Sequence, residues 1–124
     1  MALGAVGQIH ISVTDLDRSV AFYGDVLGLP LLFQVPDQQM AFFAASDVRL
    51  YLGVPESPRL RTKVLIYFRV DDIEAEYARL DRHGVTFDSA PHVVDRDGPD
   101  ELWMCFFRDP DDQHLALMQE RSSA

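Results

Sequence analysis

Apolar and polar residues alternate in two separate parts of the chain, and each alternating stretch is followed by apolar residues at helical spacing. Residues 9–13 alternate with a period of two, which is typical of a β-strand with one buried face. A helix is predicted next, capped by Thr14 or Asp15 and ended by Gly28. Its apolar stripe consists of Leu16, Val20, Tyr23 and Leu27. Residues 66–70 begin the second such stretch, which predicts a second strand and helix.

The second predicted helix is capped by Asp71 or Asp72 and ends at Gly84. Ile73, Tyr77 and Leu80 form its apolar stripe. Short β-rich runs follow each helix, and we expect strands at residues 31–35, 40–44, 48–53, 86–87, 102–107 and 114–118. Ser89 to Asp100 is long and polar, which indicates a mobile loop or an irregular edge strand.

The two halves are related in sequence order. Asp15 aligns with Asp72, and the pair Phe42-Phe43 aligns with Phe106-Phe107. This similarity predicts one domain over residues 1–124, made of module 1 at about 5–54 and module 2 at about 62–120. The expected fold class is α+β, with paired βαβββ modules forming a curved, barrel-like mixed sheet around a cleft. Strand edges and apolar surface left by such modules favour a homodimer.

Strand parity assigns residues to two faces of the predicted sheet. One face is uniformly apolar and suits packing against helices. The other face is aromatic, polar and partly charged, and it predicts a half-polar cleft. The candidate ligand-binding residues on this second face are His10, Arg49, Tyr51, Tyr67, Arg69, His114 and Ala116. Trp103 is added to them, because beside Tyr51 and Tyr67 it would form a flat slot for an aromatic ligand.

Composition narrows the choice of partner. The chain has 124 residues, of which 48% are hydrophobic, and its net charge is −9. Such a balance argues against nucleic acid and against an anionic membrane surface, and no apolar run is long enough for a membrane helix. A small-molecule ligand fits better. The single Cys105 excludes an intramolecular disulfide and fits a cytoplasmic location.

Several short stretches resemble a known superfamily. They are residues 9–13, Ala21-Phe22-Tyr23, residues 26–29 and Phe107-Arg108-Asp109-Pro110-Asp111. Together they resemble the vicinal oxygen chelate proteins, which include glyoxalase, bleomycin-resistance proteins and extradiol dioxygenases. The resemblance implies paired βαβββ modules, commonly in a homodimer. It also implies four places for metal ligands, which hold His10, Tyr51, Tyr67 and Ala116 in this chain.

Two functions follow from these four positions. Only His10 is an ordinary ligand for a divalent metal, so the sequence favours a protein that binds a small aromatic or cationic molecule without a complete metal site. The alternative is a metal-dependent lyase, isomerase or dioxygenase in which His10 is catalytic. Its cofactor would be zinc, nickel, iron or manganese, and His92, Glu101 and His114 are the residues that could help His10 hold it.

The charge of the ligand stays open at this stage. Residues 88–112 carry eight acidic and two basic side chains, which could attract a cation. Arg49 and Arg69, in contrast, could pair with a carboxylate of a small anionic substrate.

Overall fold

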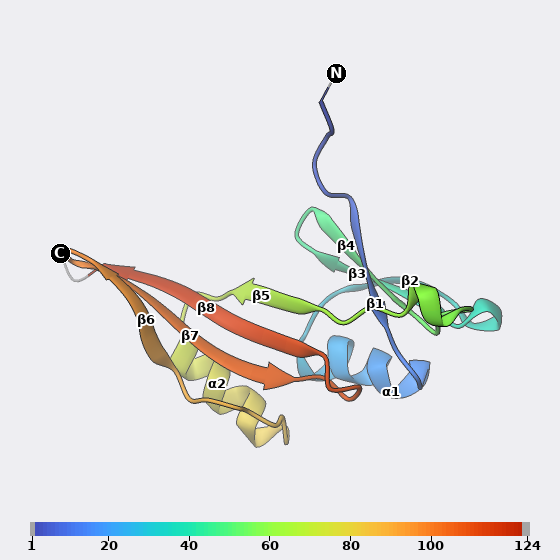
Figure 1. Ribbon diagram of the computed structural model, residues 1–124. Helices are drawn as coiled ribbons and strands as arrows, with labels where there is room; N and C mark the ends of the chain where they lie inside the picture. Colours follow the sequence, from blue (N-terminus) through green and yellow to red (C-terminus); the bar gives the residue numbers. More distant parts are fainter. Residues whose placement is uncertain (1, 123–124) are drawn as a thin grey trace. The chain divides into compact units, whose positions relative to one another are not determined.

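The computed structural model describes residues 2–122, which form two compact units divided between Lys63 and Val64. Unit 1 (Met1–Lys63) and unit 2 (Val64–Ala124) each follow the order strand, helix, three strands (Figure 1). The predicted α+β class and the βαβββ order of each module are therefore confirmed. The strands are divided between two four-stranded sheets, one in each unit.

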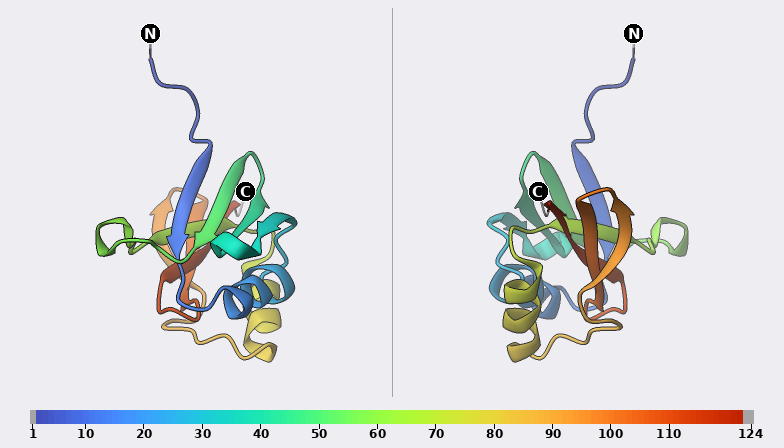
Figure 2. Two further views of the ribbon diagram at one scale, coloured as in Figure 1. Left: turned by 90° about the vertical axis from the view of Figure 1, so that its right-hand side faces the viewer. Right: turned by 90° about the vertical axis from the view of Figure 1, so that its left-hand side faces the viewer.

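Unit 1 has a mixed sheet in the order β1-β4-β3-β2. Its strands are β1 (Gln8–Ser12), β2 (Leu31–Val35), β3 (Met40–Ala45) and β4 (Val48–Gly53). Its helical segments are α1 (Leu16–Val20), the π-helical continuation η1 (Ala21–Val26), and the 3₁₀ turns η2 (Pro36–Gln38) and η3 (Pro58–Leu60). The parallel neighbours β1 and β4 lie side by side in Figure 2, which places residues distant in sequence in direct register.

Unit 2 repeats this arrangement in the order β5-β8-β7-β6. Its strands are β5 (Leu65–Arg69), β6 (His92–Asp97), β7 (Asp100–Arg108) and β8 (His114–Ser122), and its helix is α2 (Ile73–Arg82). The parallel pair is β5 with β8, and it corresponds to β1 with β4 in unit 1.

Both helices begin and end as the sequence predicts. Asp15 accepts a hydrogen bond from the backbone N–H of Arg18, and Asp72 accepts one from Ala75, each at 3.1 Å. These carboxylates satisfy first-turn amides that have no partner within the helix. Gly28 and Gly84 follow the helices with φ of 82° and 80°, a backbone conformation that favours glycine.

The hydrophobic core of each unit lies between its sheet and its helix. In unit 1, Leu50 and Phe43 are buried together with Tyr23 from the helical segment. In unit 2, Phe107 and Leu115 are buried on the strands that contact α2. Burial of each such side chain contributes about 1.5–3 kcal/mol. The opposite face of each sheet is thus left for other uses.

One strand lies elsewhere than the sequence pattern predicts. The expected strand at residues 86–87 is reduced to a single bridge between Phe87 and Phe107, and the strand that pairs with β7 is β6. The β6–β7 turn contains Gly98 at φ 61°, which permits a tight return. The alternative of an irregular edge strand within Ser89 to Asp100 is therefore confirmed, including a register shift between Val93 and Asp95.

Within residues 2–122, no helix has the length and hydropathy needed to cross a membrane.

Candidate functional site

Four aromatic side chains cross the unit 1 sheet in one row, one from each strand. Register pairs His10 with Tyr51, Tyr51 with Phe42, and Phe42 with Phe33. The Phe33 and Phe42 rings are stacked with centroids 4.5 Å apart, and the Phe42 and Tyr51 rings with centroids 4.9 Å apart. His10 lies against Tyr51 at 4.6 Å, tilted by 48°. We call these four residues the ring row.

A cation covers part of the ring row. The guanidinium of Arg49 lies 5.0 Å from the centroid of Phe42 and 6.0 Å from that of Phe33, within the range of a cation–π contact. Its Nε donates a hydrogen bond to Oε1 of Gln8 at 2.9 Å. Arg49 is therefore occupied with holding the Phe42 and Phe33 end of the row.

Gly53 provides the space in which the Tyr51 ring rests. Both residues lie on the same face of β4, and a Cβ atom at Gly53 would come within 2.7 Å of the Tyr51 ring and hydroxyl. Contacts that short do not occur between a real Cβ and a neighbouring heavy atom. The absence of a side chain at residue 53 thus fixes how the Tyr51 ring can lie.

The hydroxyl of Ser12, which is itself bonded to Thr62, contacts His10. Ser12 Oγ accepts hydrogen bonds from the N–H of Thr62 at 2.7 Å and from Thr62 Oγ1 at 3.3 Å, and it lies within hydrogen-bond distance of His10 Nε2 at 3.2 Å. The other nitrogen of the imidazole is Nδ1. That atom is buried and has no hydrogen-bond partner within residues 2–122.

Partial burial favours the neutral form of His10. Desolvation lowers the pKa of its imidazole from the ordinary value, and the backbone of Tyr51 offsets this only in part. At neutral pH the ring is therefore uncharged, and it acts in the site as an aromatic and hydrogen-bonding group.

A pocket of about 630 Å³ opens beside the His10 and Tyr51 end of the ring row. The sheet and the η2 turn supply its floor, and residues 54–63, which we call the connector, supply the facing wall. Its lining consists of His10, Gln38, Met40, Tyr51, Val54, Pro55, Glu56, Arg59, Leu60, Arg61 and Thr62. The volume is that of a typical small-molecule site.

The connector is fixed to β1 at its far end. In addition to the bonds from Thr62 to Ser12 Oγ, the N–H of Ser12 donates to Thr62 Oγ1 at 2.9 Å. Ser57 Oγ accepts from the N–H of Arg59 at 3.3 Å and so caps the short η3 turn. The pattern of the sequence predicts modules at about 5–54 and 62–120 and gives no role to the residues between them. A clue to the role of the connector was the presence of Arg59, Arg61 and Lys63 in so acidic a chain.

The equivalent row in unit 2 is interrupted. Register pairs Tyr67 with Ala116, and Ala116 with Phe106. Because Ala116 has no ring, Tyr67 and Phe106 meet only edge to face, with centroids 6.1 Å apart. Tyr67 is 43% exposed, and Ala116 is buried. The structure thus brings Tyr67 and Ala116 together in unit 2 and His10 and Tyr51 together in unit 1.

Trp103 lies on the other face of the unit 2 sheet from Tyr67 and Ala116. It shares the strand parity of Cys105 and Phe107, whose side chains are buried in the core beside α2. Its Nε1 donates to Glu101 at 3.2 Å, and Arg121 stacks on its ring at 4.5 Å. Within unit 2, Trp103 therefore does not join Tyr67 in an aromatic slot.

The remaining predicted residues of unit 2 have local partners. Arg69 and Glu120 form an exposed ion pair at 3.3 Å. His114 Nδ1 lies 3.9 Å from Asp88, whose carboxylate also accepts from Arg108 at 2.8 Å. The His92 ring is 2.7 Å from the carbonyl oxygen of Ala90. None of these contacts links the three predicted helper residues His92, Glu101 and His114 to one another.

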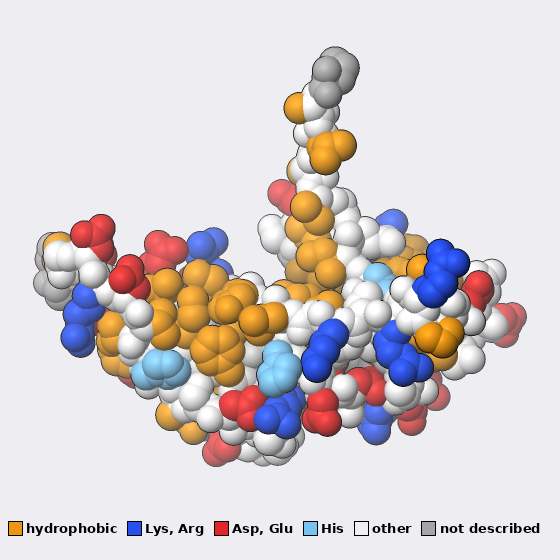
Figure 3. Space-filling view, viewed as in Figure 1, with side chains coloured by type: hydrophobic (Ala, Val, Ile, Leu, Met, Phe, Trp, Pro, Cys, Tyr) orange, Lys and Arg blue, Asp and Glu red, His pale blue; other side chains and the backbone are white. Residues whose placement is uncertain are grey.

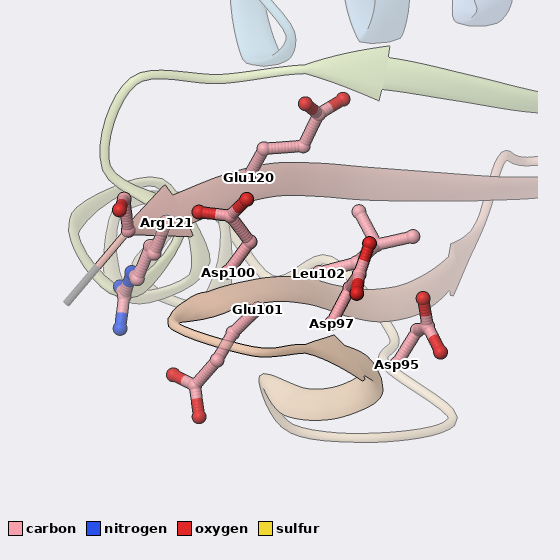
Figure 4. Close-up of a pocket in the computed structure, with 8 residues that line it drawn as sticks. Asp95, Asp97, Asp100, Glu101, Leu102, Glu120 and Arg121 are labelled. Atoms are coloured by element: carbon pink, nitrogen blue, oxygen red, sulfur yellow. The ribbon is translucent and has the colours of Figure 1, made fainter. Parts of the chain in front are cut away.

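A second pocket, of about 410 Å³, lies at the β6–β7 turn and the end of β8. Figure 4 shows Asp95 and Asp97 on β6, Asp100 and Glu101 on β7, and Glu120 on β8, with Glu101 directed away from Glu120. Glu101 pairs with Arg96 at 2.9 Å. Asp95 and Asp97 lie on the edge strand β6, where charged side chains discourage pairing with another chain.

The described residues do not contain a ready metal site. Within residues 2–122, no group of three or more His, Cys, Asp or Glu side chains is placed to hold a metal ion. His10 has Tyr51 as its register partner, and a neutral phenol is a poor ligand for a divalent metal.

The sequence and the fold both match known proteins. The family model of the Glyoxalase/Bleomycin resistance protein/Dioxygenase superfamily matches residues 5–117. The chain belongs to this superfamily, as the resemblance of its motifs predicted.

One curated protein and several solved structures are similar to this chain. The uncharacterized protein YraH of Bacillus subtilis (strain 168) is 30% identical over 120 residues, covering 84% of this chain and 89% of that protein. TnmS3, an antibiotic binding protein from Streptomyces sp. CB03234, is 27% identical with a TM-score of 0.77 over 98% of this chain and 99% of its own. Lactoylglutathione lyase from Agrobacterium tumefaciens shares the fold, with a TM-score of 0.75 and 22% identity over 96% of each chain.

Proposed function

We propose that this protein binds a small planar aromatic molecule in the unit 1 pocket, where it packs against Tyr51 and His10. The observation that carries the proposal is the ring row, because it ends at the pocket and its rings already lie against one another before any ligand is present, three of them stacked and His10 tilted. Binding to a preorganised aromatic surface avoids the entropic cost of ordering side chains.

The rest of the lining suits such a ligand. Met40, Val54 and Leu60 supply apolar contacts, and the Tyr51 hydroxyl and Gln38 can form hydrogen bonds that set its orientation. The likeness to TnmS3, an antibiotic binding protein, supports a binding role over a catalytic one.

The test uses a fluorescent neutral probe, anthracene-9-methanol, titrated into the full chain and followed by fluorescence anisotropy. We expect saturable binding of one probe per chain that Tyr51→Leu weakens by about tenfold or more, the effect of losing an aromatic contact of about 1.5 kcal/mol. Tyr67→Leu is the matched variant in unit 2, and it separates a site confined to unit 1 from one that also uses Tyr67. Absence of saturable binding, or binding that Tyr51→Leu leaves unchanged, would contradict the proposal.

A second candidate is a metal-dependent lyase, isomerase or dioxygenase that uses His10. The observation that favours it is the buried Nδ1 of His10, a nitrogen with no hydrogen-bond partner within residues 2–122. Elemental analysis of protein purified without chelator tests it. One tightly bound divalent ion per chain that is lost in His10→Ala would replace the binding proposal with the enzymatic one.

We also propose that the protein is a cytoplasmic homodimer. In support, the edge strand β2 exposes Leu31, Leu32 and Phe33 by 44–50%, and exposed apolar side chains on a strand edge favour coverage by another chain. Sedimentation analysis at tens of micromolar, roughly the range in which specific interfaces persist, should give the mass of two chains. A single-chain mass would contradict it.

A further inference from the structure

The arginines of this chain fall into two groups according to whether their side chains are paired. Seven of them donate a side-chain hydrogen bond to another side chain, and these are Arg18, Arg49, Arg69, Arg79, Arg96, Arg108 and Arg121. The guanidinium groups of Arg59, Arg61 and Arg82 donate no hydrogen bond and form no ion pair within residues 2–122. Arg82 is in the exposed last turn of α2, where a cation interacts favourably with the helix dipole.

Arg59 and Arg61 lie together on the wall of the unit 1 pocket. Leu60 separates them in sequence, and all three residues line the pocket. The N–H of Arg59 donates to Ser57 Oγ, and the N–H of Thr62 donates to Ser12 Oγ, so the connector backbone is held on both sides of them. Figure 3 shows Lys and Arg side chains gathered around η3, in a molecule whose net charge is −9.

The charge within this pocket is positive. Glu56 is its one acidic lining residue against two arginines, and His10 is neutral because burial lowers its pKa. The acidic residues near β6 and β7 belong to unit 2, and they line a different pocket. A guanidinium matches the two oxygens of a carboxylate with two parallel hydrogen bonds, and such charge-assisted bonds are stronger than neutral ones.

We infer that the ligand of this site is an aromatic anion, a planar ring system that carries a carboxylate or an equivalent acidic group. This inference rests on the proposed function. The ring packs against Tyr51 and His10, and the acidic group is bound by Arg59 and Arg61. The connector therefore selects for charge, and the sheet selects for aromatic character.

Three probes that share one ring system test the inference. They are anthracene-9-carboxylate, anthracene-9-methanol and 9-(aminomethyl)anthracene, which are anionic, neutral and cationic at neutral pH. We expect the carboxylate to bind about tenfold more tightly than the alcohol, and the ammonium to bind more weakly than the alcohol, in keeping with solvent-exposed charge-assisted bonds. Raising the salt concentration should reduce the preference for the carboxylate.

A double variant identifies the source of the preference. Arg59→Gln together with Arg61→Gln should remove most of the advantage of the carboxylate over the alcohol, both affinities being measured on the same variant. Arg82→Gln is the matched control, because it removes an unpaired arginine that lies outside the pocket, and it should leave the preference intact.

The outcomes distinguish the two proposals. If the alcohol binds and the carboxylate binds no better, or if the double variant keeps the preference, the inference about charge is wrong and the aromatic site stands. If none of the three probes binds, the aromatic site and the inference both fall.

Discussion

The same βαβββ module occurs twice in this chain, and the two copies differ most on the sheet face that turns away from the helix. In unit 1 this face carries an unbroken ring row, from Phe33 to His10. In unit 2 the matched row contains Tyr67 and Phe106 with Ala116 between them, so their rings meet only edge to face. The helix-facing sides of the two sheets, in contrast, hold equivalent buried residues.

This difference shows which part of the repeat determines the fold and which part is available for function. Phe43 and Phe107 occupy corresponding core positions opposite Leu50 and Leu115, and all four are buried. Substitutions at such positions disturb close packing. The outer row differs between the units although it also contains the buried Phe42 and Ala116: its rings are continuous in unit 1 and interrupted in unit 2.

The largest expected effect comes from the shared core. Phe43→Ala in unit 1 and Phe107→Ala in unit 2 should each reduce the free energy of unfolding by about 3–5 kcal/mol, because each leaves a cavity where a fully buried ring was. Urea unfolding measures this. A loss below about 1 kcal/mol for either variant would break the equivalence of the two cores.

The rate at which a thiol reagent labels Cys105 shows whether each of these two variants loosens the core of unit 2. Burial raises the pKa of its thiol to about 11, so in the native state it should react slowly with a thiol reagent. Phe107→Ala should accelerate labelling of Cys105 more than Phe43→Ala does, because Cys105 lies in the core of unit 2. Equal acceleration would mean that the two units open together.

The ring row itself can be disturbed without removing any ring. In Gly53→Ala the new Cβ displaces the Tyr51 ring, and we expect the affinity for anthracene-9-methanol to fall about fivefold to tenfold, close to the value of an aromatic contact. Gly7→Ala is the matched control, because a Cβ there meets no atom within 4 Å. Unchanged affinity in Gly53→Ala would show that the position of the Tyr51 ring is unimportant for binding.

Smaller effects are expected at the two helix caps. Asp15→Ala and Asp72→Ala each remove a carboxylate that accepts a first-turn amide at 3.1 Å, and each should cost about 1 kcal/mol of stability. Thermal unfolding of the two variants under one buffer measures it. Asp15→Asn and Asp72→Asn keep a capping oxygen, and they should recover most of the loss; if they do not, the loss has a cause other than capping.

The smallest effect is a pH dependence specific to unit 1, where an imidazole stands at the position that Tyr67 holds in unit 2. The folded-state pKa of His10 is lowered, so the unfolded chain binds a proton first as the pH falls. The stability that neutral His10 provides is fully present above about pH 6.5, which is the ordinary pKa of histidine. It is lost as the pH falls from there toward the lowered pKa of His10 in the folded state. Unfolding measured between pH 8 and 5 should show a slope that His10→Gln reduces; an unchanged slope would assign it to other groups.

More of the fold than of the candidate site could be predicted from the sequence. Period-two strands, capped helices and the glycines after each helix are encoded locally, so Asp15, Asp72, Gly28 and Gly84 were all expected in their roles. The β6 strand was harder to place, because Asp95, Arg96 and Asp97 lack the apolar alternation of a strand, and its position depends on pairing with β7.

The face on which a side chain lies was also difficult to predict from the local sequence pattern. Both parities of residues 102–107 are apolar, so the pattern alone could not decide which face Trp103 occupies. The pairing of His10 with Tyr51 followed from parity, but the role of the connector did not. It depends on hydrogen bonds between Ser12 and Thr62, which are fifty residues apart, and no local pattern contains them.

The use of the connector as a pocket wall has a consequence for how such proteins diversify. Residues 54–63 lie between the end of β4 and the start of β5, outside both sheets. Selection can therefore change the charge, bulk and length of this wall while the ladders and the buried core remain as they are. In a chain built from a duplicated module, the stretch that joins the copies becomes the most readily altered part of the binding site, and new ligand preferences can arise there without loss of the fold.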